Sequence, residues 1–405
     1  MARKLRIVVL GMMGRMPFAG IAWQVLHYLE GFRRLGHDVY YVEDTDNWPY
    51  DPQQNTLTDD CGYAVQYIGR LMAWCDLAEG WVFRFRPSNR TFGLSDSRLT
   101  ALFEKADILV NLHGATLFLE EHLRAPIRVY LETDPVRAEI EVAQGDPASI
   151  EQLRAHTHHF TYGENIGTPN CAIPTGGFNY RPTRQPVILD WWTTDAGPPP
   201  DGSAFTTIGN WRQTRRDIEW KGATYTWSKD REFLKFIDLP RQAQQPFELA
   251  TNLADPKTIR HGPGEVVRAE GMAAEVRQML ESHGWRIVDA ISLSKDILPY
   301  RDYILGSRGE FTVAKDLNIR LRSGWFSDRS ACYLAAGRPV ITQDTGFGKV
   351  LPTGKGLFPF NTMEEIVAAL DAISFDYVGH CQAAREIAEE YFRAEEVLAK
   401  MIAEL

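Results

Sequence analysis

The stretch that decides the fold is SGWFSDRSACYLAAGRPVITQDTGF, residues 323–347. It predicts a short helix beginning near Ser327, a tight turn, a buried strand over 340–342 and a second loop. The first turn of such a helix has free N–H groups and the positive end of the helix dipole, which together bind anions. Asp344-Thr345-Gly346 then leaves the strand's carboxyl end, the edge at which open α/β sheets bind ligands. The stretch predicts a phosphate-bearing ligand, although a ligand-free helix-turn-strand unit has the same pattern.

Apolar strands alternate with amphipathic helices along the rest of the chain. Predicted strands lie at 5–10, 38–42, 108–112, 128–131 and 159–162, and again at 205–208, 247–250, 286–288, 311–313 and 340–342. Such nearly continuous apolar strands form parallel sheets that are covered on both faces. A stretch rich in Pro and Gly separates the two sets. The sequence predicts an α/β protein of two Rossmann-like domains, 1–185 and 186–376, facing across a cleft, with a helical tail over 377–405.

Composition limits the class of protein. The 405 residues include 44 Lys+Arg and 53 Asp+Glu, a net charge of -9, which argues against a protein dominated by binding to nucleic-acid phosphates. The five cysteines are odd in number and lack metal-ligand spacing, which favours a reducing cytosol. No apolar run reaches the ~18 residues of a membrane span. We therefore expect a cytoplasmic protein without a membrane span; its oligomeric state does not follow from the sequence.

Two segments resemble the GT-B glycosyltransferases. The stretch 323–347 is similar to their donor-binding half, in which a helix, a Gly-x-Pro-Val turn and an acidic loop hold a nucleotide sugar. Pro17-Phe-Ala-Gly20, the helix that follows and Gly36-His-Asp-Val39 are similar to the start of their first half. The resemblance implies a hexosyltransferase-like enzyme with a nucleoside-diphosphate sugar, UDP-sugar first, as co-substrate and no other cofactor. It also implies that the tail 377–405 crosses back onto the first domain.

Candidate donor-binding residues follow the strands of the second half. A leaving nucleoside diphosphate gains negative charge, which the basic residues after the strand 205–208 would offset. A cation at a helix start opposes the dipole, so Arg329 indicates an anionic ligand. Cys332 stands where the family often has a ribose-binding Glu, and Glu310 is the substitute candidate. The full donor set is Asn210, Arg212, Lys221, Glu310, Lys315, Ser327, Arg329, Ser330, Asp344, Thr345 and Gly346. Instead of binding a donor, the basic residues could form solvated ion pairs, and Asp344 could close an Asx turn.

The first half supplies candidate groups for the acceptor. His113 follows one predicted strand, and Glu132 and Asp134 follow the next. A general base for an acceptor hydroxyl is a carboxylate or a His at such an edge. Asp134 is the first choice for this catalytic role and His113 the second, with a structural loop cap as the alternative for each. Gly20, Glu132 and Glu164 complete the acceptor-side candidates.

Cofactor and metal patterns are weak. The glycines after the first strand lack Gly-x-Gly-x-x-Gly spacing, which disfavours a dinucleotide cofactor. Asp44-Thr-Asp46 matches the Asp-x-Asp metal pair of the other large glycosyltransferase fold, but a two-residue match is common by chance. The His cluster at 156–159 has no Cys or Glu at zinc-ligand spacing. The sequence therefore predicts no metal site.

The leading prediction is a metal-independent glycosyltransferase that moves a sugar from a nucleoside-diphosphate sugar to a hydroxyl or similar acceptor. Three alternatives stay open: a nucleotide-sugar 2-epimerase on the same fold, a non-catalytic nucleotide-sugar-binding protein, and a glycosyltransferase acting on nucleic acid, against which the acidic balance counts. The sugar, the base, the acceptor and the choice between inversion and retention do not follow from the sequence.

Overall fold

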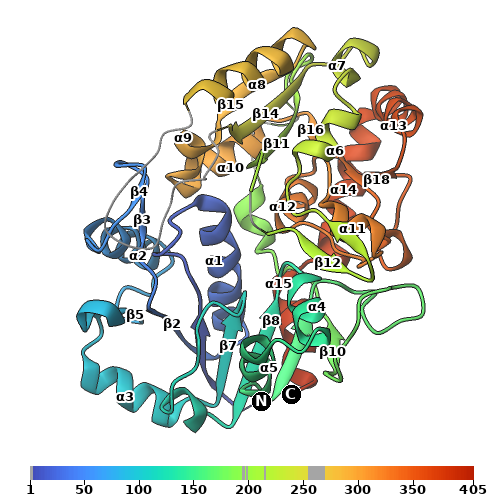
Figure 1. The fold of residues 1–405 in the computed structure, drawn as a ribbon. Helices are drawn as coiled ribbons and strands as arrows, with labels where there is room; N and C mark the ends of the chain where they lie inside the picture. Colours follow the sequence, from blue (N-terminus) through green and yellow to red (C-terminus); the bar gives the residue numbers. More distant parts are fainter. Residues whose placement is uncertain (1–2, 194–196, 198, 214–215, 254–269) are drawn as a thin grey trace.

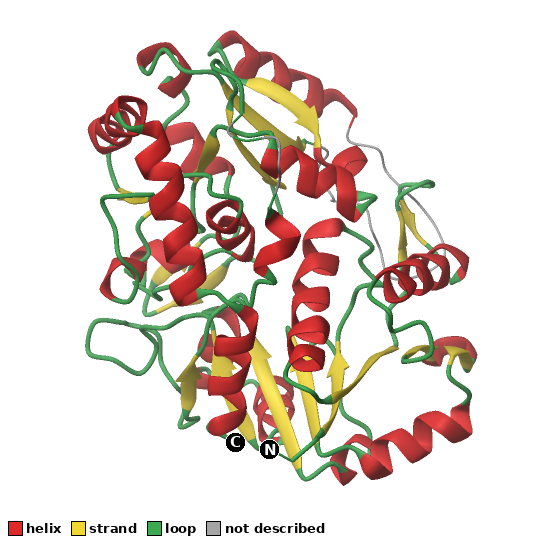
Figure 2. Cartoon of the chain, turned by 180° about the vertical axis from the view of Figure 1, so that it is seen from behind, coloured by secondary structure: helices red, strands yellow, loops and turns green. Residues whose placement is uncertain are grey.

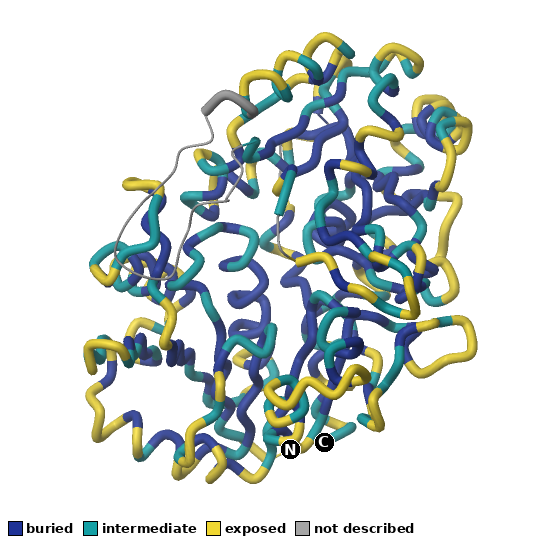
Figure 3. Tube along the Cα trace, viewed as in Figure 1, coloured by how far each residue is buried: buried dark blue, intermediate teal, exposed yellow. Residues whose placement is uncertain are grey.

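A computed structural model describes residues 3–193, 197, 199–213, 216–253 and 270–405. The chain folds into two α/β halves, each built on its own sheet (Figure 1). Seen from behind, helices cover both sheets (Figure 2). The strands of both sheets are mostly buried, and the exposed segments lie on outer helices and loops (Figure 3).

The first sheet has eight strands in the order β10-β9-β8-β7-β1-β2-β5-β6, all parallel except β6. The strands are β1 (Arg6–Leu10), β2 (Asp38–Thr45), β5 (Trp81–Phe85), β6 (Arg90–Gly93), β7 (Ile108–Leu112), β8 (Ile127–Glu132), β9 (His158–Thr161) and β10 (Tyr180–Pro182). The helices are α1 (Ala19–Arg34), α2 (Gly62–Trp74), α3 (Asp96–Lys105), α4 (Arg137–Ala143) and α5 (Pro147–Arg154), with a small hairpin of β3 (Tyr50–Asp51) and β4 (Thr56–Leu57).

The second sheet has six parallel strands in the order β15-β14-β11-β16-β17-β18. The strands are β11 (Phe205–Asn210), β14 (Phe247–Asn252), β15 (Arg286–Asp289), β16 (Gly309–Thr312), β17 (Val340–Gln343) and β18 (Leu357–Phe360). The helices are α6 (Asp230–Lys235), α7 (Leu239–Gln242), α8 (Glu270–Ser282), α9 (Ala290–Ser294), α10 (Ile297–Leu305), α11 (Asp316–Arg320), α12 (Asp328–Ala335) and α13 (Met363–Phe375). A separate hairpin, β12 (Ile218–Trp220) and β13 (Ala223–Tyr225), follows β11.

Both sheets have a topological switch point, which positions the site. The chain runs from β1 towards β2 and β5, then restarts at β7 on the other side of β1. In the second sheet it runs from β11 to β14 and β15, then restarts at β16. The crevice at the carboxyl ends of the strands at such a point is where open α/β sheets bind ligands. The predicted α/β fold of two Rossmann-like domains is confirmed.

The chain passes between the halves twice. The first passage includes the short helix η3 (Leu189–Trp192), and the second is made by α14 (Tyr377–Tyr391) and α15 (Ala394–Ala403). Helix α14 packs on α12 of the second half, whereas α15 packs on α1 of the first. The α1–α15 contact is close because Gly31 has no side chain: a Cβ there would lie 2.5 Å from a Leu398 methyl carbon. The tail therefore joins both halves.

Candidate functional site

Arg329 spans the switch point of the second sheet. Its Nε donates to Glu310 Oε1 at 2.5 Å, and its two terminal nitrogens donate to the Ile208 carbonyl at 2.5 Å and to Thr312 Oγ1 at 3.0 Å. These partners belong to β11 and β16, the two strands that flank the crevice. Glu310 is fully buried, so the ion pair is part of the fold. A guanidinium has five N–H donors, so two of them have no hydrogen-bond partner among the described residues.

A small pocket opens beside Arg329 at the ends of β11 and β14. Asn210 and Lys229 also line it. Lys229 is half-buried, lies over the Trp325 ring at 5.9 Å and has no ion pair among the residues that the structure describes. Burial, and next the charges of Arg329 and Lys315, lower the pKa of Lys229 to about 7. An anion in this pocket would offset the charge of Lys229 and lie beside Arg329.

Lys315 connects the two halves. Its ammonium forms an ion pair with Asp134 Oδ2, across 181 residues of sequence, and lies 3.4 Å from the centre of the Trp227 ring. Burial lowers the pKa of Lys315. The other carboxylate oxygen of Asp134 is buried and has no hydrogen-bond partner within the described ranges. Asp134 therefore has one oxygen available for a ligand, and its loop is fixed to the second half by a Trp325 side-chain hydrogen bond to the Thr133 carbonyl at 2.9 Å.

The three cations share a position that helices disfavour. Lys229 and Lys315 are the N-cap residues of α6 and α11, and Arg329 is in the first turn of α12. Positive charges at helix starts oppose the helix dipole. This signal identified Arg329 in the sequence, whereas Lys315 was predicted from its place after a strand. The same signal could have found Lys229, had the start of α6 been located.

His113, and Val136 close to Asp134, have unusual backbone angles. His113 has φ +60°, and Val136, two residues after Asp134, has φ +103°, which is strained for a β-branched residue. The His113 Nδ1 lies 2.6 Å from Thr133 Oγ1, and its Nε2 is buried with no partner among the described side chains and backbone. Burial, and then the charge of Arg15, lower the pKa of His113 to about 4, so this ring is neutral at pH 7. Strain of this kind concentrates at functional sites.

A second small pocket lies between the halves. Gly20 at the start of α1 lines it, together with Tyr300 and Arg329 from the second half. A Cβ at Gly20 would lie 3.5 Å from the Tyr300 hydroxyl oxygen. The acceptor candidate Gly20 and the donor candidate Arg329 therefore line one pocket.

Of the donor candidates, Asn210 and Arg329 line these pockets and the others do not. Lys221 is exposed at the turn between β12 and β13, over the Trp220 ring. Arg212 forms an ion pair with Asp230 at 3.2 Å. The structure places Lys229 where the sequence analysis expected Lys221.

Two acceptor candidates have structural partners. Glu164 accepts two hydrogen bonds from Arg184, at 2.7 and 3.0 Å, and Arg184 also donates to the Val350 carbonyl of the second half. Glu132 is buried and accepts a hydrogen bond from Thr161; burial, and next the nearby Glu139, raise its pKa. Neither residue lines either pocket.

The acidic loop after β17 is closed by its own contacts. Asp344 accepts from the Gly346 backbone N–H at 2.7 Å, which makes an Asx turn, and from Arg322 at 2.8 Å. Thr345 donates to the Trp325 carbonyl at 2.6 Å. Asn165 of the first half donates to the Gly346 carbonyl at 3.2 Å. The alternative role of Asp344 as a turn residue accounts for its geometry, and sugar binding by this loop stays a prediction.

The serines at the start of α12 are buried. Ser327 is the N-cap but makes no capping hydrogen bond through its side chain. The Ser330 hydroxyl has no hydrogen-bond partner in the part of the chain that the structure describes. A buried hydroxyl without a partner has lost its hydration, so both serines stay donor-binding candidates.

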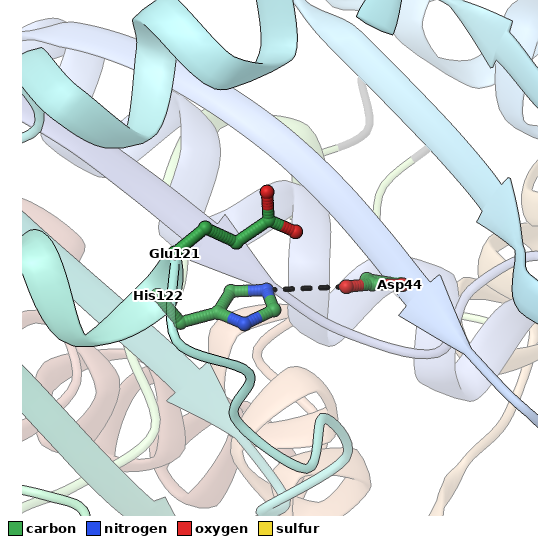
Figure 4. A group of neighbouring side chains, drawn as sticks. All are labelled: Asp44, Glu121 and His122. Carbon is green, nitrogen blue, oxygen red and sulfur yellow. Dashed lines mark ion pairs between the residues drawn. The ribbon is translucent and has the colours of Figure 1, made fainter.

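Asp44, Glu121 and His122 form a group that resembles a metal site (Figure 4). Arginines occupy it: Arg84 contacts both carboxylates, and Arg86 lies 3.5 Å from Asp44. Burial alone would raise the pKa of Asp44, but hydrogen bonds from His122 and Arg84 hold it at about 2. The negative charge that would attract a cation is already compensated, so the group serves as an ion-pair network.

Removal of divalent metal is expected to leave turnover unchanged. Fixed cations at the crevice can stabilise a departing diphosphate without an ion. The measurement is UDP release with and without excess chelator. A complete loss in chelator that manganese restores would contradict this prediction and would direct attention to Asp44 and Asp46.

Comparison with known proteins identifies the fold. No family model and no curated sequence matches the chain. Similar solved structures include an alpha-glucosyltransferase in complex with UDP and a 13-mer DNA (TM-score 0.55, 11% identity, 100% of this chain and 99% of that chain). HepE of Anabaena in complex with UDP and glucose is another such structure (TM-score 0.56, 10% identity); the match covers 99% of this chain and 100% of HepE. Sucrose-phosphate synthase of Thermosynechococcus elongatus is also similar (TM-score 0.52, 13% identity); the match covers 98% of this chain and 97% of the synthase. The chain therefore has the GT-B fold over its whole length.

Proposed function

We propose, from the GT-B fold of this chain, that it transfers a glycosyl group from a nucleoside-diphosphate sugar, UDP-sugar first, to a hydroxyl or similar acceptor without a metal ion. One observation carries the proposal: Lys229, Lys315 and Arg329 gather at the switch point of the second sheet, and Lys229 has no ion pair among the described residues. Arg329 and Lys315 are paired with Glu310 and Asp134, so Lys229 is the cation of the three whose charge has no carboxylate partner among the described residues. A diphosphate supplies the missing negative charge. Structural neighbours in complex with UDP support this choice of ligand.

The two halves would divide the work. The second half would bind the diphosphate, and its cations would stabilise the charge that develops on the leaving group. The first half would present the acceptor beside Asp134 and His113. The free oxygen of Asp134 and the unpartnered Nε2 of His113 are the groups there that can accept a hydroxyl proton.

The compartment we propose is the cytoplasm. The five cysteines are free thiols, as in proteins of a reducing environment. Among the described residues, no helix combines the length and the apolarity needed to cross a bilayer. The partners proposed are a nucleotide sugar and an acceptor whose identity does not follow from the structure.

A calorimetric titration of the chain with UDP tests the proposal. We expect saturable binding of UDP, and weaker binding by Lys229→Met, because this variant removes one of the three cations. Lys105→Met on the exposed end of α3 is the matched control and should bind UDP like the unmodified chain. If no nucleoside diphosphate binds, the proposal is wrong. If UDP binds, the chain is next incubated with UDP-glucose and no acceptor. Formation of an epimer of the sugar nucleotide would indicate a nucleotide-sugar 2-epimerase instead of a transferase.

The affinity for UDP is expected to fall as the pH rises from 7 to 9. The pKa of free Lys229 is about 7, and a bound diphosphate raises the pKa of a neighbouring ammonium. Binding therefore takes up a proton, and above pH 7 each further unit weakens binding by up to about tenfold. Calorimetry at pH 7, 8 and 9 measures this slope. Lys229→Arg keeps its charge throughout this pH range, so the slope of UDP affinity against pH should be flatter in this variant. An equal slope in the variant would mean that another group causes the pH dependence.

A further inference from the structure

The ion pair between Lys315 and Asp134 crosses the cleft between two fixed backbones. Lys315 is the N-cap of α11, and its carbonyl accepts a hydrogen bond from the Asn318 N–H at 2.9 Å. On the other side, the residue before Asp134 is Thr133, whose carbonyl accepts from Trp325 Nε1 at 2.9 Å. A lysine ammonium is a point charge with three donors on a flexible four-carbon stem. The pair can therefore open by rotation of one side chain, with both main chains in place.

This pair lies next to the pocket that Lys229 lines. The Lys229 ammonium is 5.9 Å from the centre of the Trp325 ring, the same indole that holds the loop of Asp134. The Lys315 ammonium is 3.4 Å from the centre of the Trp227 ring, and Trp227 precedes Lys229 by two residues. Two indoles thus connect the ammonium group of the pocket to both members of the ion pair. The Lys315 side chain is therefore a neighbour of both the Asp134 carboxylate and the pocket.

Burial decides which paired cation can change its partner. A phosphate group carries more than one negative charge, so Lys229 alone does not balance a diphosphate. If Arg329 left Glu310, a fully buried carboxylate would lose its counter-charge, which is costly. The Asp134 side chain is 37% exposed, so water can replace part of what Lys315 gives it. Lys315 is therefore the cation that a bound diphosphate can recruit at the lower cost.

We propose that Lys315 is a switch between the two halves: it pairs with Asp134 before the donor binds and moves to the diphosphate when the donor is bound. This rests on the proposed function and adds an order of binding to it. The Asp134 carboxylate is released towards the acceptor hydroxyl only after the donor has bound, so the acceptor is engaged second. It follows that Asp134 and a diphosphate compete for one ammonium group, and this competition can be measured without an acceptor.

The test is a double-mutant cycle on the full chain, with UDP affinity measured by calorimetry. Asp134→Asn removes the charge that competes with the diphosphate, so UDP should bind about three- to tenfold more tightly. Lys315→Met removes the shared ammonium and should weaken UDP binding at least about tenfold. The double variant should bind UDP like Lys315→Met, because without the ammonium there is no competition left for Asp134→Asn to relieve.

Each outcome of the cycle decides the matter. An unchanged or lower UDP affinity in Asp134→Asn would overturn the switch, and this variant keeps the Lys315 side chain if Lys315→Met fails to fold. Tighter binding that persists in the double variant would also overturn it, because general charge repulsion would then be the cause. Asp302→Asn, an exposed carboxylate paired with Arg301, is the control and should leave UDP affinity unchanged.

Pyrophosphate separates this inference from the proposed function. If UDP fails to bind the unmodified chain, the proposed function is wrong. The same four proteins titrated with pyrophosphate then show whether Lys315 exchanges Asp134 for a diphosphate of any origin. The same signs as predicted for UDP would keep the switch, and equal pyrophosphate affinities in all four proteins, or no binding, would overturn it too.

Discussion

Replacing Asp134 by asparagine is expected to lower turnover by about 10²–10⁴-fold, the usual contribution of a general base. The carboxylate has one oxygen on Lys315 and one without a partner in the described structure, so the second oxygen can take the proton of an acceptor hydroxyl. Asparagine keeps the size and a carbonyl oxygen for Lys315 but has no basic oxygen. The measurement is the rate of UDP release in the presence of acceptor, with UDP affinity measured alongside.

The control for this variant is Asp238→Asn, an exposed carboxylate paired with Arg241. It has the same chemistry away from both pockets and should keep full turnover. If Asp134→Asn turns over normally, the residue is a structural partner of Lys315 and His113 becomes the next candidate base. If UDP binding is lost together with turnover, the division of labour between the two halves is wrong, since the Asp134–Lys315 pair would then belong to the donor site.

Replacing Arg329 by alanine is expected to have two large effects. It leaves Glu310 buried without its ion pair, which lowers the free energy of unfolding by about 3–5 kcal/mol. It also removes the donors that face the pocket, which weakens UDP binding by about 1.5–3 kcal/mol, or roughly 10- to 150-fold. Denaturant unfolding measures the first effect and calorimetry the second.

A double variant separates these effects. Arg329→Ala with Glu310→Ala removes both charges, so most of the lost stability should return while UDP affinity stays low. Recovery of UDP binding in the double variant would mean that Arg329 acts only as the structural partner of Glu310. A single variant as stable as the unmodified chain would mean that Glu310 finds another partner.

The sequence predicted the architecture because strand periodicity and helix starts are local signals. The buried apolar runs predicted the strands of both sheets. The carboxyl end of a strand indicated Lys315, and the helix start indicated Arg329. Lys229 was missed because a hairpin, β12–β13, separates it from β11, and the basic run before that hairpin drew the prediction to Lys221.

Contacts between the halves could not be predicted in this way. The Lys315–Asp134 pair and the Arg184 hydrogen bond to the Val350 carbonyl join different strands and loops, and no periodicity relates their positions. Within the second half, the turn at Asp344 can be predicted from the sequence, but its ion pair with Arg322 cannot. Asn165, which joins the first half to the loop at Gly346, gave no signal of its own.

The indoles at the cleft give the protein a built-in optical reporter. Trp227 lies directly under the Lys315 ammonium, and Trp325 lies near Lys229. A charge close to an indole ring changes its emission, so a bound diphosphate that redistributes these ammonium groups should alter the tryptophan spectrum. Trp227→Phe and Trp325→Phe would show which ring reports the change. Ligand screening and the kinetics of cleft occupation can therefore be followed on the unlabelled chain, before any acceptor has been identified.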